Sequence, residues 1–180
     1  MRSIARIAAG AALAGWLAAC STAPPTGDAR NVMVEQASAT LRDMVREDPS
    51  LDEMVRRSYG YALFPEVTKG GLVFGGAYGR GVVYEQGQLA GYADLTAGSF
   101  GLQIGAQSFS ELILFADKVA LDRFKGGPID IAADATAIIL TTGAAANARY
   151  DEGMVVIIRP VAGAMAEASV GAQQVKFSPR

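Results

Sequence analysis

The fold is decided by the glycine-rich stretch at residues 70–83, which has the sequence GGLVFGGAYGRGVV. Short runs rich in Val, Phe and Tyr alternate there with glycine, a pattern typical of β-strands that bend or approach one another closely. A nucleotide-binding loop is excluded, because no window matches GxxxxGK[ST], and a GxGxxG beginning at Gly79 would need glycine where Tyr84 stands. The stretch therefore predicts a curved sheet. The alternative explanation is that these glycines let a ligand approach the backbone on one face of the sheet.

Further strands are expected on both sides of this stretch. Gln86-Gly87 is typical of a hairpin turn. Between Ser99 and Gln107, apolar residues alternate with small or polar ones, which predicts a strand with one buried face. The expected strands are Leu72–Gly75, Gly81–Glu85, Gln88–Leu95, Ser99–Ser108, Glu111–Ala116, Ala133–Thr141, Met154–Pro160 and, with interruptions, Ala162–Phe177.

Helices are expected mainly before the sheet. Apolar residues recur at helical spacing between Asn31 and Glu47, which predicts an amphipathic helix. Ser50-Leu51-Asp52-Glu53 matches a capping box and predicts a second, shorter helix, and Asp117–Phe124 predicts a third, capped by Asp117. We therefore expect an α+β fold in which N-terminal amphipathic helices pack on a curved, mostly antiparallel, glycine-rich β-sheet. If the curvature is strong, this sheet is expected to be barrel-like. Insertion of the apolar helix faces into a membrane is the alternative.

Residues 1–19 have the layout of a bacterial lipoprotein signal peptide. A basic start is followed by a run of 13 residues, Ile7 to Ala19, which is too short for a bilayer that needs about 20. Leu17-Ala18-Ala19-Cys20 resembles a lipobox, which implies cleavage before Cys20, a diacylglyceryl group on its thiol and palmitate-type acylation of its amine. Ser21 at the next position favours the outer membrane over the inner one. A plain secreted protein or an uncleaved anchor is the alternative.

Residues 20–30 are expected to form the lipidated cysteine and a flexible tether, because they lack apolar periodicity and contain Pro24-Pro25. Residues 31–180 are then expected to form a single domain. Loss of residues 1–19 leaves 14 basic and 18 acidic residues, a net charge of −4. This balance argues against a nucleic-acid partner and against attraction to an anionic bilayer by charge alone.

The composition excludes several catalytic chemistries. The chain has no histidine and one cysteine, so it lacks Ser-His-Asp and Cys-His catalysis, histidine-ligated metals and CxxC motifs. Two carboxylates could still hydrolyse a glycoside, but nothing in their spacing selects a pair. We therefore expect no enzyme activity, cofactor or metal. The available carboxylates are Glu66, Glu85, Asp94 and Glu111.

Three blocks carry a resemblance to a known family: Phe64–Gly71 (FPEVTKGG), Gly79–Val82 (GRGV) and Gly101–Gly105 (GLQIG). Through them the chain resembles the SYLF domain family from about Val34 to Phe177. The resemblance implies a lipid-binding module without known catalysis, found in bacterial lipoproteins and in eukaryotic endocytic proteins.

The chain also departs from that family. Where many members carry a glycine-rich turn, it has Ile138–Ala144. Eukaryotic members bind phosphoinositides, and yeast members also bind and bundle actin, but neither partner suits a bacterial envelope. Only lipid affinity is therefore carried over.

Four cations beside the family blocks are candidates to contact an anionic headgroup: Lys69, Arg80, Arg123 and Lys125. Each positive charge near such a surface contributes about 1 kcal/mol. The alternative is that they are solvated charges beside carboxylates. The expected function is a lipid-anchored bacterial lipoprotein of the cell envelope, at the outer membrane and facing the periplasm or the surface, that binds phospholipid or another amphiphile without catalysis. The alternative is a non-catalytic protein–protein interaction or structural module with an envelope protein as partner.

Overall fold

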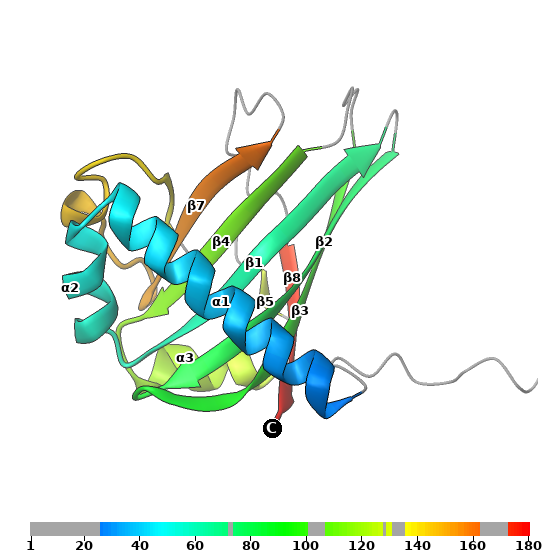
Figure 1. The fold of residues 1–180 in the computed structure, drawn as a ribbon, viewed down its shortest axis with the longest axis horizontal. Helices are drawn as coiled ribbons and strands as arrows, with labels where there is room; N and C mark the ends of the chain where they lie inside the picture. Colours follow the sequence, from blue (N-terminus) through cyan, green and yellow to red (C-terminus); the bar gives the residue numbers. More distant parts are fainter. Residues whose placement is uncertain (1–25, 72–73, 101–106, 128, 131–135, 163–172) are drawn as a thin grey trace, which may run out of the picture.

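The computed structural model describes residues 26–71, 74–100, 107–127, 129–130, 136–162 and 173–180 (Figure 1). Within these residues the chain is α+β, as expected, with helices α1 (Gly27–Glu47), α2 (Ser50–Arg57) and α3 (Lys118–Lys125) and a 3-10 turn, η1 (Ala145–Asn147). The strands are β1 (Gly60–Gly71), β2 (Phe74–Glu85), β3 (Gln88–Phe100), β4 (Gln107–Phe115), β5 (Ile129–Asp130), β6 (Thr136–Ile139), β7 (Met154–Ala162) and β8 (Gln173–Pro179).

The strands form one sheet in the order β5-β8-β3-β2-β1-β4-β7-β6. All described pairs are antiparallel except β6 with β7, so the expectation of a mostly antiparallel sheet is confirmed. The sheet is nevertheless strongly curved, since Gln173 on β8 donates a hydrogen bond of 3.1 Å to Glu111 on β4, with three strands between them in the order. Barrel-like closure was wrong, because β5 and β6 are opposite edges that do not pair within the described residues.

Both faces of the sheet are covered by apolar packing. On one face, Ala37 and Met44 of α1 and Leu51 of α2 pack against the sheet. On the other face, Leu121 and Phe124 of α3 lie in a second cluster. Figure 1 shows α1 crossing one face diagonally while α3 lies on the far side. The predicted packing of N-terminal helices on the sheet is therefore confirmed.

Strand β7 shows why the sequence builds a sheet buried on both faces. Its residues Met154-Val155-Val156-Ile157-Ile158 are all buried. Successive side chains of a strand point to opposite faces, so Val155 and Ile157 join the α1 cluster while Val156 and Ile158 join the α3 cluster. A continuous apolar run is what such a strand requires.

Strand β1 was not among the strands expected from the sequence, and it contains Pro65. Proline cannot donate to a strand ladder and normally sits at a bulge or an edge. The structure places it at a bulge, since the pairing of β1 with β2 shifts between Leu63 and Glu66. The predicted Gln86-Gly87 turn is confirmed: these residues have φ values of 48° and 77°, which suit the tight hairpin between β2 and β3.

The N-terminal ends of helices α1 and α2 differ from those expected from the sequence. Helix α1 begins at Gly27 with Thr26 as its N-cap, so the last part of the expected tether (residues 20–30) is helical. The predicted Ser50 capping box was wrong. The carboxylate of Asp48 instead accepts from the backbone N–H and hydroxyl of Ser50, at 3.0 and 2.6 Å. Glu53 forms ion pairs with Arg56 and Arg57.

The predicted cap of the third helix is confirmed, because Asp117 accepts from the Ala120 N–H at 2.9 Å. The predicted signal peptide (residues 1–19), Cys20 and the GLQIG block at 101–105 lie outside the described residues. The predicted strand Ser99–Ser108 is described only at its ends, in β3 and β4.

Candidate functional site

Two hollows lie on opposite flanks of helix α1, where it crosses strands β1 and β2. The larger one, with a volume of about 370 Å³, lies on the flank of α1 facing α2 and is called the tyrosine groove here. That volume falls in the range of about 300–1,000 Å³ typical of small-molecule pockets. The tyrosine groove is lined by Ala37, Ser38, Leu41, Arg42, Val45, Asp52, Val55, Tyr61, Leu63 and Tyr84.

Two tyrosines from neighbouring strands form one wall of the tyrosine groove. Tyr61 on β1 lies directly opposite Tyr84 on β2, and their rings stack with centroids 5.0 Å apart. Burial raises the pKa of Tyr61 to about 12, and the neighbouring Tyr84 adds to the effect. Both phenols are therefore neutral at physiological pH. Buried Ala37 of α1 and Leu63 of β1 also line the groove, so its lining is mostly apolar.

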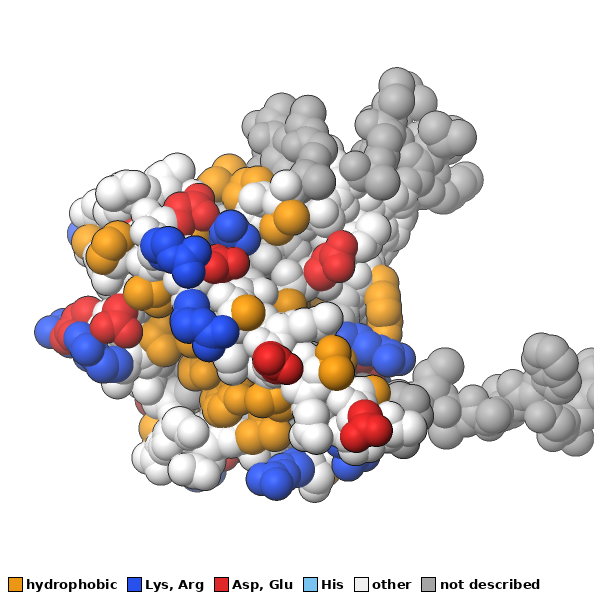
Figure 2. All heavy atoms as spheres, viewed as in Figure 1, with side chains coloured by type: hydrophobic (Ala, Val, Ile, Leu, Met, Phe, Trp, Pro, Cys, Tyr) orange, Lys and Arg blue, Asp and Glu red, His pale blue; other side chains and the backbone are white. Residues whose placement is uncertain are grey.

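The rim of the tyrosine groove carries the charges. Asp52 pairs with Arg56 at 3.0 Å. Exposed Arg42 has no ion pair among the residues that the structure describes. Figure 2 shows hydrophobic side chains gathered on this face beside α1, next to Lys and Arg side chains. The arrangement combines an apolar slot with a cation at its edge.

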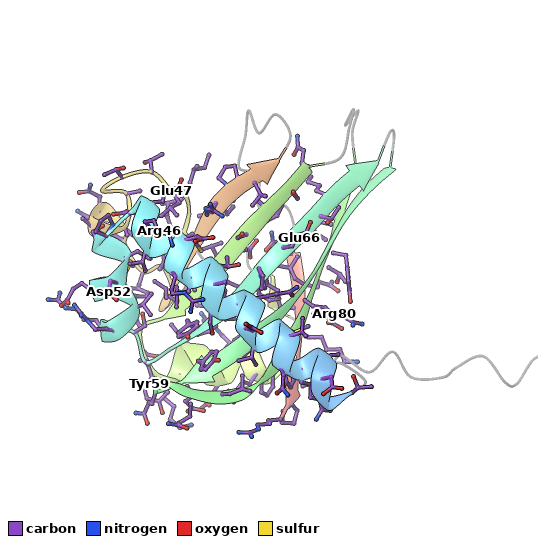
Figure 3. All side chains as sticks on the ribbon, in the orientation of Figure 1. Arg46, Glu47, Asp52, Tyr59, Glu66 and Arg80 are labelled. Atoms are coloured by element: carbon purple, nitrogen blue, oxygen red, sulfur yellow. The ribbon has the colours of Figure 1, made fainter. Side chains whose placement is uncertain are left out.

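The smaller hollow lies on the other flank of α1 and has a volume of about 290 Å³. Its lining includes Met33 of α1, Glu66 of β1, and Tyr78 and Arg80 of β2. The Nε of Arg80 donates to the Tyr78 hydroxyl at 2.6 Å. In Figure 3, Glu66 and Arg80 lie on one side of α1 and Asp52 on the other. A larger share of its lining residues is charged or polar than in the tyrosine groove.

Arg80 belongs to a row of alternating charges that crosses four strands. Glu66 lies opposite Arg80, Arg80 opposite Asp94, and Asp94 opposite Lys176. The Nε of Arg80 is 3.6 Å from the Asp94 carboxylate. Burial raises the pKa of Asp94, although Arg80 and Lys176 oppose that shift. Arg80 thus already has an anionic partner within the sheet.

The four predicted headgroup residues do not form one patch. Lys69 lies opposite Ala77, so both are on the α3 side of the sheet. Arg80 is two residues before Val82 on β2, so both are on the α1 side. Arg123 and Lys125 come from α3. Cys20, the predicted lipidation site, lies outside the described residues.

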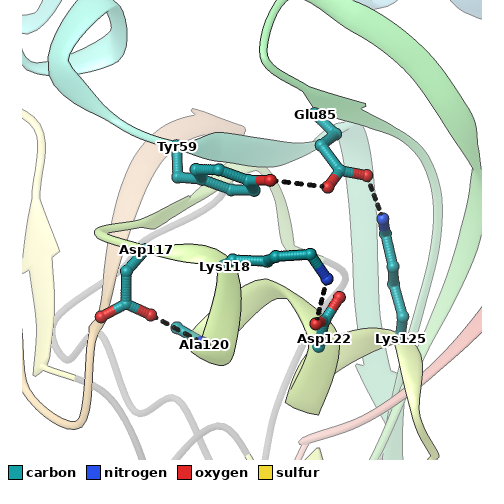
Figure 4. A network of polar contacts seen from close by, with 7 residues as sticks. All are labelled: Tyr59, Glu85, Asp117, Lys118, Ala120, Asp122 and Lys125. Atoms are coloured by element: carbon teal, nitrogen blue, oxygen red, sulfur yellow. Dashed lines mark hydrogen bonds and ion pairs between the residues drawn. The ribbon is translucent and has the colours of Figure 1, made fainter.

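Arg123 and Lys125 hold α3 against the sheet. Arg123 donates to the backbone carbonyl of Glu152 at 2.6 Å. Lys125 pairs with Glu85, which also accepts from the Tyr59 hydroxyl at 3.1 Å (Figure 4). Hydrogen bonding by Lys125 lowers the pKa of Glu85, so the Glu85 carboxylate is ionised at neutral pH. These contacts favour the alternative that these cations are paired structural charges.

The carboxylates considered for catalysis are dispersed. Glu66 and Asp94 flank Arg80, Glu85 is bound by Lys125, and Glu111 is buried on the α3 face of the sheet. Burial raises the pKa of Glu111 to about 7, although the hydrogen bond from Gln173 opposes the shift. Among the described residues, no group of three potential metal ligands is found.

Arg42, Tyr61 and Tyr84 were not among the site residues expected from the sequence. The helical spacing of Ser38, Leu41, Arg42 and Val45 could have shown that these residues share one flank of α1. The stacked tyrosines depend on the pairing of β1 with β2, which the pattern of the sequence does not specify.

No protein-family model matches the chain, and no curated protein sequence matches it. None of the described helices is both long and apolar enough to cross a bilayer.

Proposed function

We propose that this chain is a lipid-anchored bacterial envelope protein, attached through Cys20 at the outer membrane, whose SYLF-like domain binds phospholipid or another amphiphile without catalysis. The observation that carries the binding proposal is the tyrosine groove, which joins an apolar lining to the cation Arg42, and Arg42 forms no ion pair with any described residue. An amphiphile presents the same two features, an apolar chain and a polar head. Such clefts with few polar groups are the usual form of small-molecule sites.

Liposome flotation tests this proposal. All described helices and strands lie in residues 27–179, so the chain from Ser21 onward contains this fold without the acylated cysteine. We expect residues 21–180 to float with vesicles containing an anionic phospholipid, and more weakly with purely zwitterionic ones because Arg42 then lacks an anionic partner. Absence of flotation with every anionic mixture would overturn lipid binding.

The alternative is a non-catalytic protein–protein interaction, and one observation favours it. Strand β6 pairs only with β7 among the described strands, so its other edge is open, and Ile139 on it is 38% exposed. An open edge can accept a strand from a partner. Under this alternative, residues 21–180 would stay with the soluble fraction in flotation.

A further inference from the structure

We propose that the tyrosine groove holds a single acyl chain of an anionic amphiphile, with the negatively charged head at Arg42. This inference rests on the proposed function and names the ligand class and the site. It places the site at the junction of α1, α2 and the β1–β2 pair, rather than at the four cations beside the family blocks.

The shape of the groove suits a chain-like ligand. Its helical wall runs from Ala37 to Val45, two turns of α1, which at 1.5 Å per residue is about 12 Å long. The stacked rings of Tyr61 and Tyr84 form the facing wall. An elongated, mostly apolar groove between a helix and a sheet accommodates a linear hydrocarbon better than a compact polar molecule.

Among the described residues, the polar groups of the groove have hydrogen-bond or ion-pair partners, apart from Arg42 and the two phenols. The hydroxyl of Ser38 donates to the Val34 carbonyl at 2.9 Å, and Asp52 is held by Arg56. Within the described residues Arg42 forms no ion pair. The groove therefore offers one positive charge without a compensating anion, which selects a negative head.

A brominated fatty acid and a tryptophan reporter test the site directly. The only tryptophan of the chain is Trp16, so residues 21–180 contain none. Tyr84→Trp places a single indole in the groove. Tyr78→Trp is the matched control, because Tyr78 lies on the same strand and lines the other hollow. We expect 11-bromoundecanoate, titrated below its micelle concentration, to quench the fluorescence of Tyr84→Trp and not of Tyr78→Trp, while undecanoate quenches neither.

The charge requirement is tested in the Tyr84→Trp background. Arg42→Gln should weaken 11-bromoundecanoate binding about fivefold, since one nearby cation contributes about 1 kcal/mol. Arg46→Gln is the matched control: Arg46 lies one turn further along α1, pairs with Asp43 and is outside the groove. Neutral 11-bromoundecanol should bind both variants equally.

Absence of quenching in Tyr84→Trp, or equal quenching in Tyr78→Trp, would overturn the groove assignment. Tyr61→Trp provides the same reading if Tyr84→Trp fails to fold, as judged by circular dichroism. Equal loss of affinity in Arg42→Gln and Arg46→Gln would overturn the role of Arg42. Flotation of unmodified residues 21–180 decides the proposed function separately. Flotation without quenching would keep lipid binding and reject this site.

Discussion

Glu111 is the residue whose protonation matters most for stability. Its side chain is fully buried, accepts one hydrogen bond from Gln173, and leaves its Oε1 without a partner. Its pKa is raised to about 7 from 4.5, so the folded state binds the proton more tightly than the unfolded chain. The contribution of Glu111 to stability is therefore greatest below pH about 4.5, falls as pH rises through 7, and stays reduced above it.

Glu111→Gln should remove that pH dependence. A neutral amide of the same size keeps an acceptor for Gln173 and gives up the buried charge. We expect the variant to exceed the original chain in stability at pH 8 by on the order of 3 kcal/mol, with little difference at pH 4.5. Urea unfolding of residues 21–180 at the two pH values measures this. An equal stability difference at both would contradict the assigned titration.

Among the elements, α2 depends on Asp48 for its position. The buried carboxylate of Asp48 accepts from Ser50 and from the backbone N–H of Ala145 in η1, the latter at 2.8 Å. Burial alone would raise the pKa of Asp48, but these hydrogen bonds outweigh it and lower the pKa. Its contribution is therefore intact above pH about 4 and is lost as pH falls through the folded-state pKa.

Asp48→Asn should cost roughly 2–3 kcal/mol at pH 7, because an amide cannot accept with both of its terminal atoms and a buried N–H loses its partner. Asp43→Asn is the matched control, since Asp43 forms an exposed pair with Arg46 worth less than about 1 kcal/mol. Urea unfolding of both variants checks the difference. Similar small losses would show that Asp48 does not fix the junction of α2 with η1.

Several elements could be predicted from sequence because their signals are local. The turn at Gln86-Gly87 and the Asp117 cap each depend on two to four neighbouring residues. Strand β1 could not be predicted in this way, since a proline such as Pro65 argues against a central strand. The bulge that accommodates it is defined only by the pairing of β1 with its two neighbours. The tyrosine groove was also beyond sequence reasoning, because it combines α1, α2 and two strands whose relative positions are set by packing on both faces.

For the whole molecule, the proposed attachment to the membrane is separable from the fold. Cys20 precedes Gly27, the first residue of α1, by seven positions, so its substitution should leave the described domain intact. We expect the full chain expressed in bacteria to fractionate with membranes, and Cys20→Ala to leave them, since several acyl chains anchor firmly where one is marginal. Ser21→Ala should stay membrane-bound. Retention of Cys20→Ala in the membrane fraction would refute the lipoprotein proposal.

The charge row Glu66–Arg80–Asp94–Lys176 has a consequence for how the chain finds its native alignment. Glycine-rich strands are prone to slip past one another, because few side chains distinguish one pairing from the next. If β2 slipped by two residues, Arg80 would leave both carboxylates and a charge would face Val82 or Tyr78 instead. One row of four charged side chains thus disfavours incorrect strand registers across four strands. Its value lies in the structures that it excludes more than in the stability that it adds.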